Sequence, residues 1–303
     1  MTMTTNEYLK SMLNAQSLAS DSEEMNELRE ARDAVQILLD EKFSASSPTI
    51  RYGGSKAKGT MIRENYDLDI ICYFAHDDTD AGETLPDIFA NVHAALQTDY
   101  VVTAKKSALR LYDQQGADFH IDVVPGRFTD DTKTDVFIHQ AEGEKSRLKT
   151  NLQVHIDHIA GSGVTDAIKL MKLWAIRNAV QIKTFALELA VVELLSGKST
   201  KDLESQIVHA LTELRDSVDS IHIEDPANPT GNDLSALLDE GVRKQLSHIA
   251  GNTLLTIDAD NWEGVFGQVS DLAESEMLTS FSVAASESPA ESRPWCDPGK
   301  REN

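Results

Sequence analysis

Residues 49–74 have the sequence TIRYGGSKAKGTMIRENYDLDIICYF, in which two β-prone runs flank a glycine-rich turn. The first run, Thr49–Tyr52, leads directly into Gly53–Ser55. Glycine lacks a Cβ atom and adopts backbone conformations that other residues avoid, so this segment is typical of a strand-to-helix turn. The second run, Leu68–Phe74, is a continuous apolar segment of the length expected for a buried strand. We therefore predict two strands connected through a glycine turn that opens a helix.

Three aspartates lie on or beside predicted strands. Asp67 and Asp69 flank Leu68, and because side chains alternate along a strand, we expect both carboxylates to project from the same face. Asp122 lies within the apolar run 119–124 (FHIDVV), where burying a lone carboxylate is costly unless it binds a metal ion or a strong partner. These three residues are the candidate catalytic and metal-binding set.

The chemistry of the two motifs is complementary. Carboxylates suit Mg²⁺ or Mn²⁺, and two such ions can activate a hydroxyl group and neutralise a leaving pyrophosphate in an in-line displacement. The backbone amides of the glycine turn, the Ser55 hydroxyl and the helix start that follows can bind phosphate oxygens. Either motif alone fits a plain glycine turn beside surface aspartates. Together they predict a nucleotide site with two Mg²⁺ ions, or Mn²⁺ in their place.

The rest of the chain changes character near residue 165. Before that point helical and β-prone segments alternate, with helices predicted over 20–43 and 85–96 and β-rich runs over 100–104, 108–112 and 119–124. Ser20 and Glu23 form a capping-box pattern at the first helix, and Pro125 is expected to stop the last strand. Beyond residue 165 the periodicity is helical, over 167–180, 184–195, 201–218 and 234–249.

Residues 52–60 (YGGSKAKGT), 67–69 (DLD) and 121–125 (IDVVP) together resemble the signature of polymerase-β-type nucleotidyltransferases. They are most similar to the branch that holds 2′-5′-oligoadenylate synthases, cyclic GMP-AMP synthase and the bacterial cGAS/DncV-like enzymes (CD-NTases) of anti-phage signalling. The resemblance implies that the three aspartates hold the metals. It also implies an α/β (α+β) fold: a polymerase-β-like nucleotidyltransferase lobe with a mixed β-sheet and an N-terminal helix (1–160) and a helical C-terminal lobe (161–273). Residues 274–303 are rich in Ser, Glu and Pro and have little apolar periodicity, so we expect a flexible tail there.

The resemblance continues into the helical half. Residues 169–174 (KLMKLW) and 184–189 (TFALEL) are similar to the spine helix of the family and the segment after it, where basic and hydroxyl groups reach the donor triphosphate. For Lys169, a place on the solvent face of an amphipathic helix explains the sequence equally well. The substrate-binding residues that the resemblance implies are Gly54, Ser55, Lys169, Lys172 and Thr184.

Two further features bear on particular relatives. Residues 225–232 (DPANPTGN) resemble a loop found late in this branch, although by themselves they are a turn-rich connector. The animal DNA sensor of the branch carries a zinc-binding insert. Here the chain has two cysteines, and His155 and His158 have no convincing ligand spacing, so we expect no structural zinc.

Composition limits the partners of the protein. Fifty acidic residues against 28 basic ones give a formal charge of −22, which repels polyanions, so we expect no constitutive binding of double-stranded nucleic acid. No apolar stretch approaches the ~20 residues of a membrane span, and residues 1–10 lack the pattern of a signal peptide. Cys72 lies in an apolar run far from Cys296, so we expect a buried thiol. These features favour a cytoplasmic protein without a membrane partner.

The preferred hypothesis is a metal-dependent nucleotidyltransferase that joins nucleoside triphosphates into a cyclic di- or oligonucleotide second messenger and releases pyrophosphate. ATP is the expected substrate, with GTP or pyrimidine triphosphates as further candidates. A regulatory protein and an effector that binds the product are the expected partners. The alternatives are a linear 2′-5′-oligoadenylate synthase, an RNA-tailing or other nucleotidyltransferase, and a non-catalytic nucleotide-binding module.

Overall fold

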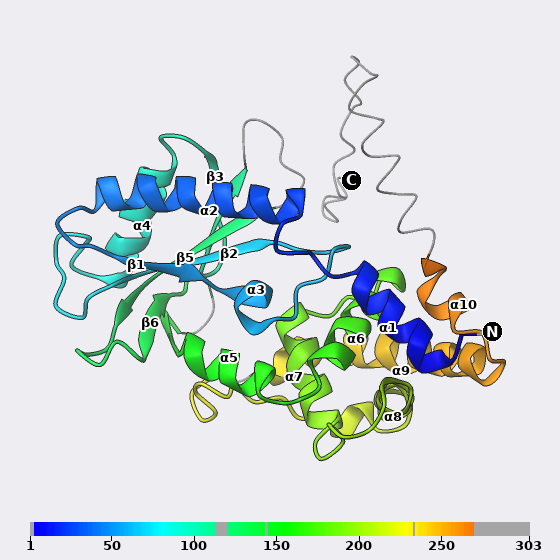
Figure 1. Ribbon diagram of the computed structural model, residues 1–303. Helices are drawn as coiled ribbons and strands as arrows, with labels where there is room; N and C mark the ends of the chain where they lie inside the picture. The colour runs from blue at the N-terminus through cyan, green and yellow to red at the C-terminus, as the bar shows by residue number, and fades with distance from the viewer. Residues whose placement is uncertain (1–2, 113–119, 143–144, 233, 270–303) are drawn as a thin grey trace, which may run out of the picture. The chain divides into compact units, whose positions relative to one another are not determined.

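A mixed β-sheet organises the first half of the chain (Figure 1). The computed structural model describes residues 3–112, 120–142, 145–232 and 234–269, and within them the sheet has seven strands in the order β1-β2-β5-β4-β3, with β6 joining β5 to β7. Strands β2 and β5 are parallel, and the other pairs are antiparallel. The strands are β1 (Thr49–Tyr52), β2 (Leu68–Phe74), β3 (Val101–Ala104), β4 (Leu109–Tyr112), β5 (Ile121–Phe128), β6 (Val136–His139) and β7 (Arg147–Thr150).

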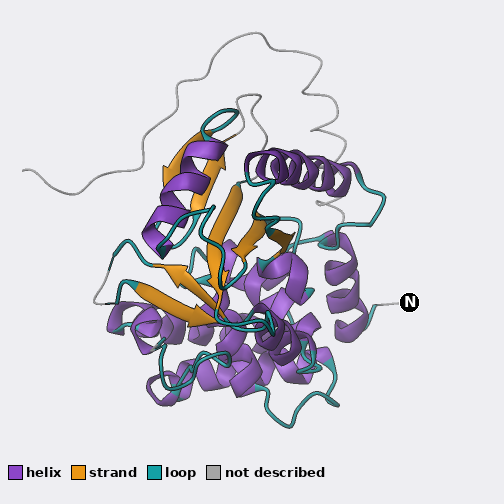
Figure 2. Ribbon diagram, turned by 90° about the vertical axis from the view of Figure 1, so that its left-hand side faces the viewer, coloured by secondary structure: helices purple, strands orange, loops and turns teal. Residues whose placement is uncertain are grey.

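Helices form two groups around this sheet. Helices α2 and α4 pack together over one face of it, whereas α5 to α9 lie beyond the other face (Figures 1 and 2). Helix α1 comes from the start of the chain but contacts α6 and α8 in the helical half. The helices are α1 (Thr5–Ala15), α2 (Glu23–Lys42), α3 (Gly54–Lys58), α4 (Leu85–Leu96), α5 (Leu152–Ala160), α6 (Thr165–Arg177), α7 (Thr184–Leu194), α8 (Leu203–Asp216), α9 (Glu240–Asp258) and α10 (Glu263–Phe266), with short 3-10 turns at Val218–Ser220 and Ser235–Leu238. The predicted fold class, a mixed sheet followed by a helical C-terminal region, is confirmed.

Strand β2 has two faces of different chemistry. Leu68, Ile70 and Cys72 are buried in the hydrophobic core that the sheet shares with α2 and α4. Ile71 belongs to a second, smaller cluster. Since side chains alternate along a strand, Asp69 shares the face of Ile71, away from the α2–α4 layer. The carboxylate therefore points toward the side of the sheet that carries the helical half.

Two local predictions were wrong. Helix α2 begins at Glu23 with Ser22 as its N-cap, since the Ser22 hydroxyl accepts a hydrogen bond from the amide of Met25 at 3.2 Å. The capping box at Ser20 does not form. Strand β5 also continues through Pro125, which lies between the part of β5 paired with β4 and the part paired with β6. The missing N–H of proline is tolerated best at such a change of partner.

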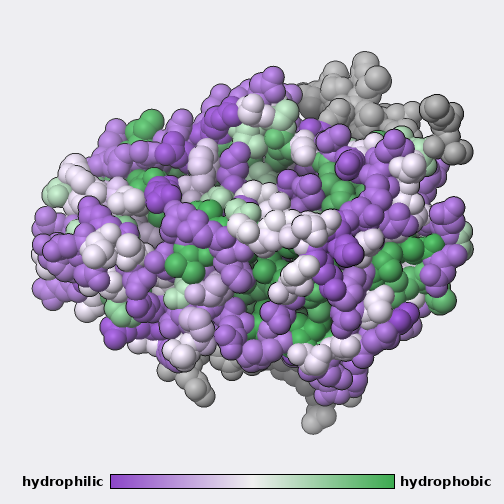
Figure 3. All heavy atoms as spheres, turned by 60° about the horizontal axis from the view of Figure 1, so that its bottom comes forward, coloured by the Kyte–Doolittle hydropathy of each residue, from purple (hydrophilic) through white to green (hydrophobic). Residues whose placement is uncertain are grey.

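One face of the molecule is largely hydrophilic. Hydrophilic side chains cover most of the face drawn in Figure 3, as the acidic composition suggests, with hydrophobic atoms exposed between them. Among the described residues, no helix is both long enough and apolar enough to cross a membrane. Cys72 is buried within β2. The expected tail, 274–303, lies outside the described residues.

Candidate active site

The glycine turn packs directly onto Asp69. The amide of Gly53 donates a hydrogen bond to the carbonyl of Asp69 at 2.8 Å, which ties the turn to β2. Gly54 has a φ angle of 49°, and a Cβ atom placed there would lie 1.5 Å from Oδ2 of Asp69. Only glycine satisfies both the left-handed backbone and this close approach. The turn and the carboxylate thus form one rigid unit.

Sheet register brings the three predicted carboxylates together in part. Asp69 and Asp122 are direct partners on the parallel strands β2 and β5. Burial, followed by the charges of Asp122 and Asp67, raises the pKa of Asp69 to about 6. Like charges held together in this way destabilise one another unless a cation neutralises them. The set therefore has the electrostatic character of a cation site.

Asp122, however, already has a cationic partner. The guanidinium of Arg110, directly opposite on β4, forms a bidentate ion pair with its carboxylate. Bidentate arginine–carboxylate pairs are among the stronger charge-assisted hydrogen bonds in proteins. Unlike Asp67 and Asp69, Asp122 is not among the residues that line the neighbouring cavity. Two of the three carboxylates thus line the cavity, and the third, that of Asp122, lies beside them in an ion pair with Arg110.

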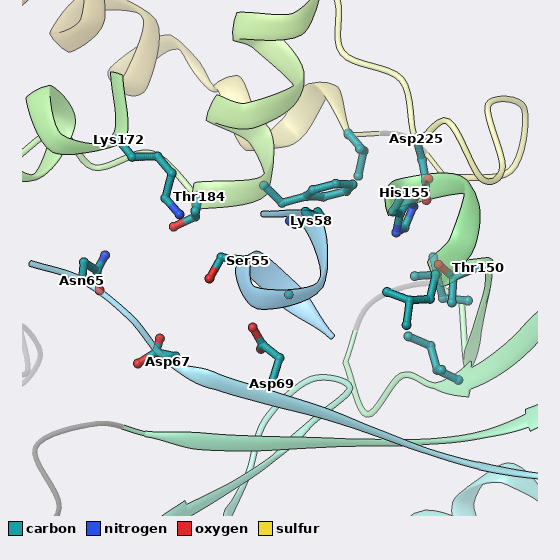
Figure 4. Close-up of a pocket in the computed structure, with 16 residues that line it drawn as sticks. Ser55, Lys58, Asn65, Asp67, Asp69, Thr150, His155, Lys172, Thr184 and Asp225 are labelled. Atoms are coloured by element: carbon teal, nitrogen blue, oxygen red, sulfur yellow. Dashed lines mark hydrogen bonds and ion pairs between the residues drawn. The ribbon is translucent and has the colours of Figure 1, made fainter. Parts of the chain in front are cut away.

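The cavity has a volume of about 470 Å³, a size typical of sites for small ligands. Figure 4 shows Asp67 and Asp69 on one side of it, Lys172 and Thr184 on the opposite side, and Ser55 between them. Charged and hydroxyl groups therefore converge at the end of the cavity that these residues line. The cavity is also lined by apolar side chains from the sheet, the helices and the connector after α8, namely Ile138, Leu148, Leu152, Phe185 and Leu234.

The residues predicted to bind substrate divide into two groups. Gly54, Ser55, Lys172 and Thr184 all line the cavity. Lys169 does not line it, and its ammonium group lies 3.9 Å from the carboxylate of Asp166, three residues earlier on α6. Helix geometry explains this difference, because positions three residues apart point about 60° away from each other and only one of them faces the cavity.

A second polar group lies at the other end of the cavity. His155 on α5 and Asp225 in the connector after α8 are joined by a hydrogen bond of 2.7 Å. Asp225 is buried and also accepts hydrogen bonds from the side chain of Asn232 and the amide of Ala227. The ring of His155 lies 4.9 Å from that of Phe185. The cavity thus has an ionic end and an aromatic end.

The fit of a divalent metal to these residues is partial. Among the described residues, no group of three or more His, Cys, Asp or Glu side chains is arranged to hold a metal ion. Mg²⁺ in nucleotide sites is commonly held by one or two carboxylates, with phosphates and waters completing its coordination. Asp67 and Asp69 meet that requirement at the cavity, and Asp122 could join them once released from Arg110.

Several site residues were not predicted from the sequence. Lys58, His155 and Asp225 line the cavity, and Glu188 contacts its lysines from behind. Lys58 lies inside the quoted YGGSKAKGT motif, and Asp225 opens the turn-rich segment, so both stood within stretches already singled out. Glu188 likewise lies inside the quoted TFALEL segment, whereas His155 carries no local signal, since its role depends on a partner far away in the chain.

Solved structures with this architecture include bacterial CD-NTases. CdnC of E. coli MS115-1 shares 20% identity in its complex with HORMA-deltaN (TM-score 0.65, covering 88% of this chain and 98% of that one) and 21% in its ATP complex (TM-score 0.64, 88% and 99%). CdnG of Bradyrhizobium diazoefficiens with GTP shares 14% (TM-score 0.68, 89% and 97%). DncV of Vibrio cholerae, a cyclic AMP-GMP synthase, shares 15% (TM-score 0.57, 88% and 87%).

At the level of sequence the result is different. No protein-family model matches the chain, and no curated protein matches it. The structural likeness nevertheless spans most of this chain and most of each neighbour. The chain therefore has the cGAS/DncV-like CD-NTase fold, as the motifs at residues 52–60, 67–69 and 121–125 led us to expect.

Proposed function

We propose that this protein is a nucleotidyltransferase that joins nucleoside triphosphates into a cyclic di- or oligonucleotide and releases pyrophosphate. One observation carries the proposal: Gly54 packs its backbone against Asp69, so that a phosphate-binding type of turn and a carboxylate pair line one cavity. The CD-NTase fold supports it, because the similar structures include proteins solved with ATP and GTP and a cyclic AMP-GMP synthase.

The two ends of the cavity suggest how a nucleotide would lie. The triphosphate would occupy the ionic end, where the Ser55 hydroxyl, the Thr184 hydroxyl and the Lys172 ammonium can donate hydrogen bonds to its oxygens. The base would then lie between the apolar walls toward Phe185 and His155, which offer aromatic surfaces for stacking. Lys169, which does not line the cavity, would act only as a more distant positive charge.

In the proposed reaction, a ribose hydroxyl oxygen of one nucleotide attacks the α-phosphorus of another. The bond between the α-phosphorus and the oxygen that bridges to the β-phosphate breaks, pyrophosphate leaves, and a carboxylate of Asp67 or Asp69, or water beside it, takes the hydroxyl proton. A second transfer of the same kind closes the ring. Holding both reactants in line supplies much of the rate enhancement in such transfers.

Mg²⁺ or Mn²⁺, two ions in our proposal, would be held by Asp67, Asp69 and Asp122 and would supply charge neutralisation for the polyphosphate. The contribution of the chain itself is to keep these carboxylates close despite their repulsion. The contact between Gly54 and Asp69 and the pairing of β2 with β5 provide that rigidity.

The biological part of the proposal extends the family resemblance of the motifs. We place the protein in the cytoplasm, with the cyclic product as a second messenger in anti-phage signalling that a downstream effector binds. A regulatory protein is a further proposed partner, because CdnC has been solved in complex with HORMA-deltaN. The acidic composition argues against constitutive binding of double-stranded nucleic acid.

The ion pair between Arg110 and Asp122 favours one second candidate, a module that binds nucleotides without turning them over. In such a module the arginine would permanently replace the cation that the third carboxylate would otherwise bind. Binding of ATP without release of pyrophosphate would identify it.

The test is to incubate the purified protein with all four nucleoside triphosphates and Mg²⁺ or Mn²⁺, and to determine product masses and phosphatase sensitivity. We expect a cyclic product that resists phosphatase, together with pyrophosphate. A linear product with exposed terminal phosphates would instead indicate an oligoadenylate synthase or tailing enzyme. Asp69→Asn is the matched inactive control, and turnover by this variant at the parental rate would refute the assignment.

A further inference from the structure

A buried cluster of charges lies directly behind the ionic end of the cavity. Glu188 on α7 is fully buried, and its two carboxylate oxygens accept hydrogen bonds from the ammonium of Lys58 and the hydroxyl of Thr60. The ammonium of Lys172 on α6 lies 3.8 Å from the same carboxylate and donates a hydrogen bond of 2.7 Å to the carbonyl of Thr60. Three separate segments of the chain meet in this cluster.

The cluster holds two cations on a single anion. Within the cluster, Lys58 and Lys172 contribute two positive charges and Glu188 one negative charge, while the carboxylates of Asp69 and Asp67 act on Lys172 from outside it. Lys58, Lys172 and Glu188 are 7%, 3% and 0% exposed, respectively, so water screens the charges poorly. Two ammonium groups this deeply buried repel each other and cost free energy unless a counter-charge accompanies them. Glu188 is the carboxylate that contacts both.

Both lysines, but not Glu188, line the cavity. An ammonium group has three donors. Among the described residues, Lys58 donates to Glu188 and faces the ring of Phe185 at 4.8 Å, and Lys172 donates to Thr60. Each ammonium therefore keeps donors for a ligand on the cavity side. Two neighbouring ammonium groups with spare donors are suited to bind the oxygens of an anion.

We propose that Glu188 is a positioning residue, which holds the ammonium groups of Lys58 and Lys172 side by side at the place where a triphosphate binds. The inference rests on the proposed function and deepens it, since it adds Lys58 to the triphosphate ligands and gives Glu188 a role through the lysines. It also gives a reason for Thr60, whose hydroxyl and carbonyl complete the link between the glycine turn and the two helices.

A purely structural role for Glu188 makes a different prediction. If the carboxylate only locked the turn to the helical half, its loss would lower stability but leave the triphosphate affinity of the folded protein intact. A positioning role changes that affinity, and it does so through the lysines. Two residues that act through one another show non-additive effects in a double-mutant cycle, whereas independent residues show additive ones.

The experiment measures the Kd for ATP with Mg²⁺ by calorimetry in the full chain for the parental protein, Glu188→Gln, Lys58→Met and the double variant. Glutamine preserves the size of the side chain but removes the counter-charge and presents an amide donor to the ammonium groups. We expect each single variant to weaken binding roughly tenfold and the double variant to be little weaker than either one. KM should rise accordingly, while kcat changes little.

Glu193→Gln is the matched control, because Glu193 lies on the same helix with its side chain exposed. It should leave the Kd unchanged. If Glu188→Gln does not fold, Glu188→Asp takes its place, since it keeps the charge but retracts it from the lysines, and it should also weaken binding. Circular dichroism establishes which variants are folded.

Two results would overturn the inference: a folded Glu188→Gln protein with the parental Kd, or single effects that simply add in the double variant. A parental protein that binds no triphosphate is a separate result, which refutes the proposed function and this inference with it. The parental titration thus distinguishes failure of the site from failure of the role of Glu188.

Discussion

The guanidinium of Arg110 holds both carboxylate oxygens of Asp122, with Nε 2.8 Å from Oδ1 and Nη2 2.6 Å from Oδ2. The two residues face each other across β4 and β5, while Asp122 faces Asp69 across β5 and β2. The carboxylate of Asp122, which the motif assigns to a metal, therefore lies between a cation, Arg110, on one neighbouring strand and an anion, Asp69, on the other. A divalent ion that used Asp122 would have to compete with the arginine.

Removing that competitor should strengthen metal binding. We expect Arg110→Gln to bind Mn²⁺ about tenfold more tightly than the parental protein, since a partly exposed bidentate pair is worth about 1–2 kcal/mol and 1.4 kcal/mol corresponds to tenfold. Titration of free Mn²⁺ by electron paramagnetic resonance measures this without any turnover. Arg215→Gln is the control, because Arg215 forms a similar pair with Asp216 at an exposed position. Unchanged or weaker Mn²⁺ binding in Arg110→Gln would contradict the competition.

Gly54 should not tolerate a side chain. Gly54→Ala places a methyl group against the carboxylate of Asp69 in addition to straining the left-handed backbone, so we expect lost nucleotide binding and a stability loss of more than about 1 kcal/mol. Gly197→Ala is matched to it, since Gly197 has a φ angle of 70° but open space where its Cβ would lie. That control should show the backbone cost alone, with nucleotide binding retained. Equal binding by the two variants would exclude the close approach as the cause.

Asp69→Asn should stabilise the metal-free protein at neutral pH. The pKa of Asp69 is raised from 3.8 to about 6, so the folded state holds the proton more firmly than the unfolded state and loses stability as pH rises from about 4 to 6. Asparagine carries no charge, so we expect a gain of about 3 kcal/mol above pH 6 that vanishes below pH 4. Urea unfolding with a chelator present measures it.

Product formation by the same variant should fall by roughly a thousandfold or more, because a carboxylate that neutralises transferring phosphates cannot be replaced by an amide. Asp77→Asn, at an exposed carboxylate, is the control for both measurements. Loss of stability in Asp69→Asn at pH 7 would argue against the electrostatic repulsion described for the carboxylates.

Asp225 should anchor the wall of the cavity. Asp225→Asn replaces an oxygen that accepts from Asn232 with a donor, which leaves a buried donor without an acceptor. We expect a loss of about 2 kcal/mol in the free energy of unfolding and a higher KM, since the connector also holds His155 at the aromatic end. Asp219→Asn, at an exposed position, should change neither quantity. A normal KM in Asp225→Asn would separate the connector from substrate binding.

Much of the fold was predictable because its signals are local. Strands β1 and β2 and helix α4 have the bounds expected from their apolar runs, since alternation and helical periodicity act over a few residues. Strands β6 and β7 and helix α5 were not predicted from the sequence. The predicted end of β5 at Pro125 was wrong, because the effect of a proline on a strand depends on which strand lies beside it.

The sequence by itself established the glycine turn, the alternation that sets Asp67 and Asp69 apart from Leu68, and the helical second half. Each of these follows from the chemistry of neighbouring residues. Packing alone determined that Arg110 would hold Asp122, that His155 would meet Asp225, and that Glu188 would hold a lysine 130 residues away. Such partners are brought together only when sheet and helices close around a common core, so no short-range pattern of residues can encode them.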